Sequence, residues 1–312
     1  MNFRTQIPIV KQSDNLIDYH SNLLLLGSCF SENIGEKLSY FKFQSAINPF
    51  GILFHPKAIE TFLERVINQK FYSEEELIFQ NEQYHCLDAH SSLSNTNKED
   101  LLNNLSSILI SSYEQISNTT HLIITLGTAW VYEYIETGKT VANCHKIPQK
   151  EFNKRLLSVE EIKSSLLNVE KLIRSVNSKV QLIYTVSPVR HIKDGFVQNK
   201  QSKAHLLTAI HQTLNVSYFP SYEIMMDELR DYRFYKEDMI HPNQIAVDYI
   251  WKRFVEVWVS EKSLLTMKEI EVIQKGLAHK PFNPQSQKHQ LFLENIERKI
   301  VEIQSKLPNV KF

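Results

Sequence analysis

The chain has 312 residues, of which 42% are hydrophobic and 22% charged, as in ordinary soluble globular proteins. No apolar run is long enough to cross a bilayer, and the 35 basic residues balance the 35 acidic ones without long blocks of either sign. We therefore expect neither a membrane nor a nucleic-acid partner, and favour a small-molecule ligand. Three cysteines are too few for a disulfide framework, and the N-terminus lacks the apolar stretch of a secretory signal, so we expect a cytoplasmic chain with reduced thiols.

Short apolar runs alternate with helical patterns over the first 225 residues. The patterns predict strands at 22–26, 121–127 and 180–188, two further strands within 41–51 and 216–224, and helices at 31–41, 98–117 and 158–175. Strands that alternate with helices imply right-handed crossovers and a parallel sheet. The sequence therefore predicts an α/β fold in three layers, with about five parallel strands.

Two segments interrupt this alternation, and we interpret them as insertions at the rim of the sheet. Residues 71–95 show partial alternation and polar turns, and residues 129–145 are typical of a hairpin that turns at Thr137 and Gly138. Helical patterns with apolar residues three and four apart fill the end of the chain. We predict one domain over 1–258 and appended helices over 259–312, which cover the domain or, as the open alternative, form a homodimer contact.

Ser28 stands where a nucleophile would be expected. It follows the first predicted strand by one residue, and a helix that starts near Ser31 would aim its free N–H groups and the positive end of its dipole at the same place. Gly27 would allow the chain to turn tightly enough to expose the hydroxyl. The open alternative is that Ser28 or Ser31 only caps the helix.

Asp238 and His241 supply what a serine nucleophile needs. They lie just before a helix that starts near Gln244, with two residues between them in a tight loop. The carboxylate of Asp238 can accept from one imidazole nitrogen of His241 while the other nitrogen faces Ser28. The pair strengthens the interpretation of Ser28 as a nucleophile.

Several segments together resemble one family. They are GSCFSENIG, INPFGILFHP, ITLGTAWVYE, ANCHKIP, TVSPVRH and EDMIHPNQ, in this order along the chain. As a set they are similar to the GSCFA family, which falls in the SGNH/GDSL hydrolase superfamily. The resemblance implies a flavodoxin-like three-layer fold and a Ser-His-Asp hydrolase site without a cofactor.

The resemblance also assigns roles to single residues. Ser28 matches the nucleophile, and Gly51 matches a glycine whose N–H joins that of Ser28 in an oxyanion hole. The superfamily pattern expects an Asn where this chain has Ala129, and losing one such donor costs about two to three orders of magnitude in rate. We expect Thr128 or Asn48 to substitute for it.

The remaining matches concern the residues around the nucleophile. Gly27 replaces the acidic residue that the superfamily pattern has before the serine, whereas Asp238 and His241 match without departure. Cys29, next to Ser28 at a helix N-terminus, is the alternative nucleophile.

Five further residues are candidates for substrate binding because they follow predicted strands or lie in the rim insertions: Trp130, His145, Arg190, Asp88 and His90. The aromatic ring of Trp130 could stack on a sugar, and Arg190, with His191 beside it, could clamp an anionic group. Cys86, Asp88 and His90 alternate in a manner that a metal site would also show. We nevertheless expect no metal ion.

The function that these residues favour is an esterase or deacylase acting on an O-acyl substrate, for example an O-acetylated carbohydrate. An O-acyltransferase would use the same three residues, and a ligand-binding protein with weakened activity is the other alternative, because Ala129 removes an expected donor.

Overall fold

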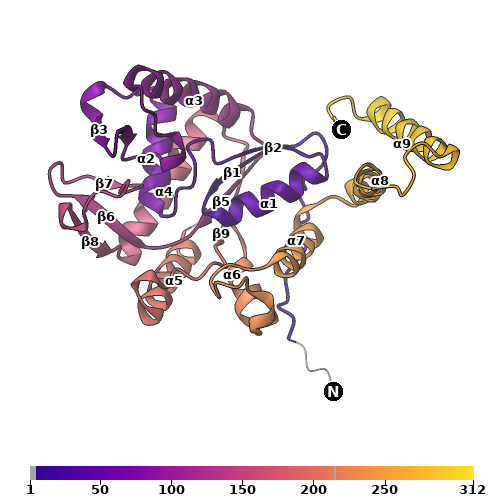
Figure 1. The fold of residues 1–312 in the computed structure, drawn as a ribbon. Coiled ribbons are helices and arrows are strands. Elements are labelled where there is room, and N and C mark those ends of the chain that lie inside the picture. The colour runs from indigo at the N-terminus through magenta and orange to yellow at the C-terminus, as the bar shows by residue number, and fades with distance from the viewer. Residues whose placement is uncertain (1–4, 214–215) are drawn as a thin grey trace.

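The computed structural model describes residues 5–213 and 216–312, so the first four residues of the predicted domain lie outside the description. Its centre is a five-stranded sheet in the order β10, β9, β5, β1, β2, with every neighbouring pair parallel (Figure 1). The strands are β1 (Asn22–Gly27), β2 (Gln44–Ile47), β5 (His121–Leu126), β9 (Gln181–Val186) and β10 (Ser217–Phe219). Counted along the chain, this order is 2-1-3-4-5, the flavodoxin-like arrangement. The predicted α/β fold class is confirmed.

Helices cover both faces of the sheet (Figure 1). One face carries α2 (Pro56–Ile67), α3 (Lys98–Asn118), α4 (Val159–Val176) and α5 (Phe196–His211), and the other carries α1 (Cys29–Tyr40) and α7 (Gln244–Trp258). In β1, Leu24 and Leu26 pack into the first layer, whereas Leu23 and Leu25 pack into the second. Burial on both faces explains why the strand is a continuous apolar run.

Two small antiparallel sheets form the rim. A hairpin joins β3 (Leu77–Gln80) to β4 (Gln83–Cys86), and a three-stranded sheet contains β6 (Trp130–Tyr134), β7 (Thr140–Val141) and β8 (Phe152–Leu156). The hairpin turn expected at Thr137 and Gly138 lies between β6 and β7. The patterns predicted no element at β8, α2 or α5.

The last helices are α8 (Glu261–Leu277) and α9 (Gln287–Lys306). Their buried residues Ile270 and Ile296 belong to the same apolar cluster as α1 and α7, and the side chain of Gln274 donates to the carbonyl of Tyr40 at 2.8 Å. The pair therefore packs beside the outer helices of one layer, at the end of the molecule away from the rim sheets (Figure 1). Within 5–213 and 216–312, no helix has the length and apolar content that crossing a membrane requires.

Candidate active site

The strand order reverses between β1 and β5, because β2 lies on one side of β1 while later strands continue on the other. In open parallel sheets the ligand site lies beyond the carboxyl ends of the strands at this switch point. Ser28 follows β1 directly, and Gly127 follows β5 directly. The sheet topology thus places both residues where a site is expected.

Ser28 is the N-cap of α1 and is fully buried. Its Oγ accepts from the N–H of Phe30 at 3.2 Å and donates to the Oγ of Ser187 at 2.9 Å. Its backbone N–H donates to the carbonyl of Thr125 at 3.0 Å. The serine therefore does cap the helix, and its hydroxyl also joins the loop after β9.

Gly27 is required for this turn. Residues that carry a Cβ rarely adopt its φ of 125°, and a Cβ there would stand 2.1 Å from the carbonyl oxygen of Thr125. The N–H of Gly27 donates to Oδ1 of Asn48 at 2.9 Å. An acidic side chain at this position, as in the superfamily pattern, would not fit.

Asp238 and His241 form a pair in the loop before α7. Nδ1 of His241 lies 2.7 Å from Oδ2 of Asp238, while Oδ1 accepts from the N–H groups of His241 at 3.0 Å and Ile240 at 2.8 Å. The backbone bond from His241, then that from Ile240, lower the pKa of Asp238 to about 2. Asp238 is therefore a carboxylate at neutral pH, and it fixes the orientation of the His241 ring.

Arg190 holds this loop to the sheet. Its N–H donates to the carbonyl of Ile240 and its guanidinium donates to the carbonyl of Met239, both at 3.2 Å. The guanidinium also lies 5.4 Å from the ring centre of Phe196 and 5.5 Å from that of Tyr235. The structure thus engages Arg190 with the loop, whereas the sequence suggested an anion clamp.

No hydrogen bond joins Ser28 to His241 among the residues that the structure describes. His191 lies nearby instead: a Cβ on Gly127 would stand 3.1 Å from Nε2 of His191 and 3.4 Å from Cβ of Ser28. This Nε2 is buried without a partner. Burial, then the charges of Lys203 and His241, lower the pKa of His191 to about 3, so the ring is neutral at neutral pH.

Two buried polar residues of α5 were missed by the sequence analysis. Nζ of Lys203 donates to the carbonyls of Gly127 at 2.7 Å and Ser187 at 2.8 Å, and Oγ of Ser202 accepts from the N–H of Ala129 at 2.7 Å. The available signal was their spacing from Leu206, which puts them on the apolar face of a helix.

The four expected oxyanion donors differ in their present partners. The N–H of Ser28 is bonded within the sheet, and that of Gly51 donates to the carbonyl of Asn48 at 2.7 Å. The hydroxyl of Thr128 lies 3.1 Å from that of Ser202 and accepts from the N–H of Trp130. Nδ2 of Asn48 is buried without a partner, beside the Gly27 turn. Asn48 is therefore the expected donor whose N–H groups remain available.

Comparison with protein families decides the relationship that the motifs suggested. The model described as the GSCFA family matches residues 22–254, and the model of the GSCFA domain protein, C-terminal domain, matches residues 270–312. The chain belongs to the GSCFA family. The comparison with curated proteins finds no match.

Among solved structures, this GSCFA chain is similar to a carbohydrate esterase family 3 from Talaromyces cellulolyticus. The likeness covers 80% of this chain and 99% of that chain, at 9% sequence identity and a TM-score of 0.36. At this level it carries no argument about activity.

A cleft of about 450 Å³ adjoins the switch point of the GSCFA fold. Its lining includes Phe54, Thr128, Trp130, Tyr132, His145 and Lys193. The carbonyl of Phe54 accepts from the N–H groups of Gly127 and Thr128, at 2.8 and 3.1 Å, which connects the cleft to the Ser28 turn. Two expected substrate residues, Trp130 and His145, therefore line it.

The other rim candidates lie elsewhere. Asp88 accepts from the hydroxyl of Tyr72 at 3.1 Å, approaches Arg65 at 3.4 Å and lines two other clefts. His90 packs over Gly51, with Nδ1 2.9 Å from the hydroxyl of Ser92. In the part of the chain described, no group of three His, Cys, Asp or Glu residues is arranged to hold a metal ion.

Cys29 is half-buried, and burial raises the pKa of its thiol despite a bond with Ser28. A cysteine nucleophile requires the opposite shift. The direction of this shift argues against the alternative that Cys29 is the nucleophile.

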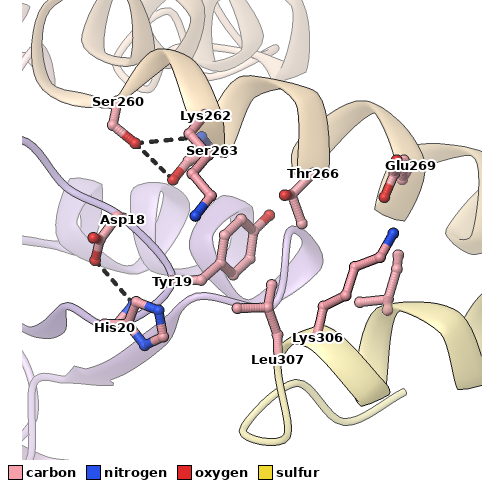
Figure 2. Close-up of a pocket in the computed structure, with 11 residues that line it drawn as sticks. Asp18, Tyr19, His20, Ser260, Lys262, Ser263, Thr266, Glu269, Lys306 and Leu307 are labelled. Atoms are coloured by element: carbon pink, nitrogen blue, oxygen red, sulfur yellow. Dashed lines mark hydrogen bonds between the residues drawn. The ribbon is translucent and has the colours of Figure 1, made fainter.

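Another cleft, of about 290 Å³, is shown in Figure 2. It lies near the start of β1, at the end of the strand opposite to Ser28. The loop that contains Asp18, Tyr19 and His20 faces α8 and the end of α9 across it. It is separated from Ser28 by the length of the strand, so it does not belong to the candidate active site.

Proposed function

We propose that the protein is an SGNH-type serine hydrolase, an esterase or deacylase with Ser28, His241 and Asp238 as its catalytic residues. The observation that carries the proposal is the placement of Ser28 at the switch point, on the N-terminus of α1. The loop with the Asp238 and His241 pair is bonded to the end of β9 through Arg190. Ser28 and the loop of this pair are thus both attached at the carboxyl end of the sheet, which supports their assignment to one site.

The reaction follows from these groups. Oγ of Ser28 attacks the ester carbonyl, and Nε2 of His241 takes its proton while Asp238 stabilises the imidazolium. The ester C–O bond breaks, and the leaving alcohol takes the proton from His241. A water molecule then hydrolyses the acyl-serine by the same proton transfers. The hydroxyl of Ser28 has to turn from Ser187 toward His241 for the first step.

The oxyanion requires donors that compensate for Ala129. Nδ2 of Asn48 is the candidate, because it is buried, unpartnered and joined to Gly27 through the other atom of its amide. Donors that are fixed before the reaction stabilise developing charge at low reorganisation cost.

The proposed substrate is an O-acyl carbohydrate, with O-acetylated sugars as the first class to examine. Trp130 and Tyr132 lie on one face of β6 and line the cleft beside Gly127 and Thr128. Aromatic faces suit stacking on a sugar ring, and the bonds of Gly127 and Thr128 to Phe54 connect this cleft to the Ser28 turn. Transfer of the acyl group to a second sugar hydroxyl would use the same residues.

Covalent trapping with a fluorophosphonate probe tests the nucleophile. The wild type should be labelled, Ser28→Ala should not, and Cys29→Ser should remain labelled. An unlabelled wild type whose fold is intact by circular dichroism would refute the catalytic proposal and favour a binding protein. Labelling that survives in Ser28→Ala but disappears in Cys29→Ser would move the chemistry to the thiol.

A second experiment identifies the base and the acyl acceptor. Loss of labelling in His191→Gln but not in His241→Gln would assign the base to His191, whose buried Nε2 has no partner. Product analysis with acetylated sugars, with and without added acceptor sugar, separates hydrolysis from transfer. Acetate release that is unchanged by acceptor supports the hydrolase.

A further inference from the structure

Lys203 is a buried cation that the proposed reaction does not use. Its side chain is only 1% exposed, and its Nζ donates to the carbonyls of Gly127 and Ser187. Among the ion pairs of residues 5–213 and 216–312, none involves Lys203. Burying an ammonium group without a carboxylate partner is costly, and such groups concentrate at functional sites.

The two carbonyls connect Lys203 to both sides of the candidate site. Gly127 follows β5 and approaches Cβ of Ser28, whereas Ser187 follows β9 and accepts from the hydroxyl of Ser28 through its own Oγ. Lys203 therefore contacts the two residues that stand against the nucleophile. A positive charge in a water-excluded place of this kind interacts strongly with negative charge that develops beside it.

The charged and titratable groups around Lys203 come from four parts of the fold. They are Cys29 at the start of α1, His191 after β9, Lys200 on α5, and Tyr222 and Glu223 in α6 (Ser221–Glu223). Burial is the largest cause that lowers the pKa of Lys203 to about 7. The amine thus changes its charge in the pH range in which a histidine base operates.

We propose that Lys203 is a positioning residue that supplies, through Ser187 and Gly127, the electrostatic stabilisation that Ala129 fails to provide. It holds the two carbonyls in place, and its ammonium charge stabilises the anionic tetrahedral intermediate at Ser28. The inference rests on the proposed hydrolase function. It adds a group that the superfamily pattern of nucleophile, glycine and amide does not contain.

Three variants test this role. Lys203→Met removes the charge at similar length, Lys203→Arg retains it, and Lys200→Met removes a charge one turn earlier on the same helix as the matched control. With p-nitrophenyl acetate, we expect kcat of Lys203→Met to fall about a hundredfold, the scale of one lost oxyanion donor, with KM unchanged within twofold. Lys203→Arg should recover part of kcat, and Lys200→Met should resemble the wild type.

The pH profile distinguishes this role from a structural one. The labelling rate of the wild type by fluorophosphonate should fall on the alkaline side as the ammonium group loses its proton, and Lys203→Met should lack that fall. A folded Lys203→Met protein with wild-type kcat would overturn the inference, as would an unchanged alkaline limb.

Three further outcomes complete the test. If Lys203→Met does not fold, the wild type decides: a labelling rate that does not fall at alkaline pH overturns the inference. An alkaline fall in the wild type, together with activity in Lys203→Arg, supports the inference. A wild type that is not labelled at all refutes the proposed function and this inference together. Ser28-dependent labelling at equal rates in wild type and Lys203→Met refutes only the role of Lys203.

Discussion

The two halves of the candidate site differ in how the fold holds them. Ser28 is fully buried, and its N–H and hydroxyl are bonded to β5, α1 and the loop after β9. The side chains of His241 and Asp238 are 40% and 42% exposed, and they bond to each other within one loop. The proposed nucleophile, which we call the sheet half, is therefore fixed by the sheet. The proposed base and its carboxylate, which we call the loop half, are fixed by local loop geometry and by Arg190.

The largest expected effect comes from removing the loop half of the chemistry. His241→Ala should lower the labelling rate about a thousandfold, because the proton of Ser28 then has no general base. The rate is measured by quenching the reaction of the purified proteins with the fluorophosphonate probe at successive times. His20→Ala removes an imidazole from the cleft at the opposite end of β1 and serves as the control. Equal rates in His241→Ala and wild type would exclude His241 from catalysis.

A substitution in the sheet half should lower the free energy of unfolding. Gly27→Ala forces a side chain into the left-handed backbone region and against the carbonyl of Thr125, so we expect a loss of about 3 kcal/mol or more in unfolding free energy. Urea denaturation measures it. Gly138→Ala is the matched control, because its φ is also positive, at 65°, but nothing lies within 4 Å of a Cβ there. Similar losses in both variants would show that contact with Thr125 is unimportant.

The same contrast explains what the sequence could predict. The buried strands of the sheet are continuous apolar runs, so their positions and the parallel fold followed from pattern alone. The pairing of Asp238 with His241 was also accessible, because both residues lie in one short loop. Local spacing carries such information directly.

Contacts between distant segments were not accessible in this way. Lys203 reaches Gly127 and Ser187 only because α5 packs across the ends of β5 and β9, and the polar α5 sequence predicted no helix there. Arg190 was assigned to substrate because its position after a strand is typical of a ligand-binding residue. Its carbonyl partners at 239 and 240 belong to a loop fifty residues away, which spacing cannot reveal.

The sheet half also predicts a dependence of stability on pH. An unfolded lysine holds its proton up to its usual pKa of 10.5, whereas buried Lys203 gives it up near 7. Between these values the unfolded chain binds more protons, so the unfolding free energy should rise with pH, by up to about 1.4 kcal/mol per pH unit. Below pH 7 both states are protonated and this contribution to the slope vanishes.

Urea denaturation at pH 6, 7, 8 and 9 checks the slope. Lys203→Met should lose the rise between pH 7 and 9. Lys200→Met should keep a rise that begins at a higher pH, because the charge of Lys200 helps to lower the pKa of Lys203. The same slope in wild type and Lys203→Met would mean that Lys203 does not titrate in this range.

The smallest expected effect concerns the connection between the two halves. Arg190→Met removes the bond to the carbonyl of Met239 and the planar group beside Phe196 and Tyr235. A hydrogen bond from a charged group is worth roughly 1.5 kcal/mol, so we expect the labelling rate to fall about tenfold as the loop loosens. Arg190 and Arg230 line one cleft, and Arg230→Met, which removes an exposed guanidinium there, is the control.

Hydrogen exchange locates the effect of Arg190→Met. The amides of Ile240 and His241, which donate to Asp238, should exchange faster in the variant, whereas the amide of Ser28 should exchange at the wild-type rate because it belongs to the sheet. If Arg190 instead clamps an anionic substrate, exchange in the loop stays unchanged and only KM for anionic esters rises. Faster exchange at Ser28 as well would show that the two halves are mechanically one unit, and that the base is held as firmly by the sheet as the nucleophile is.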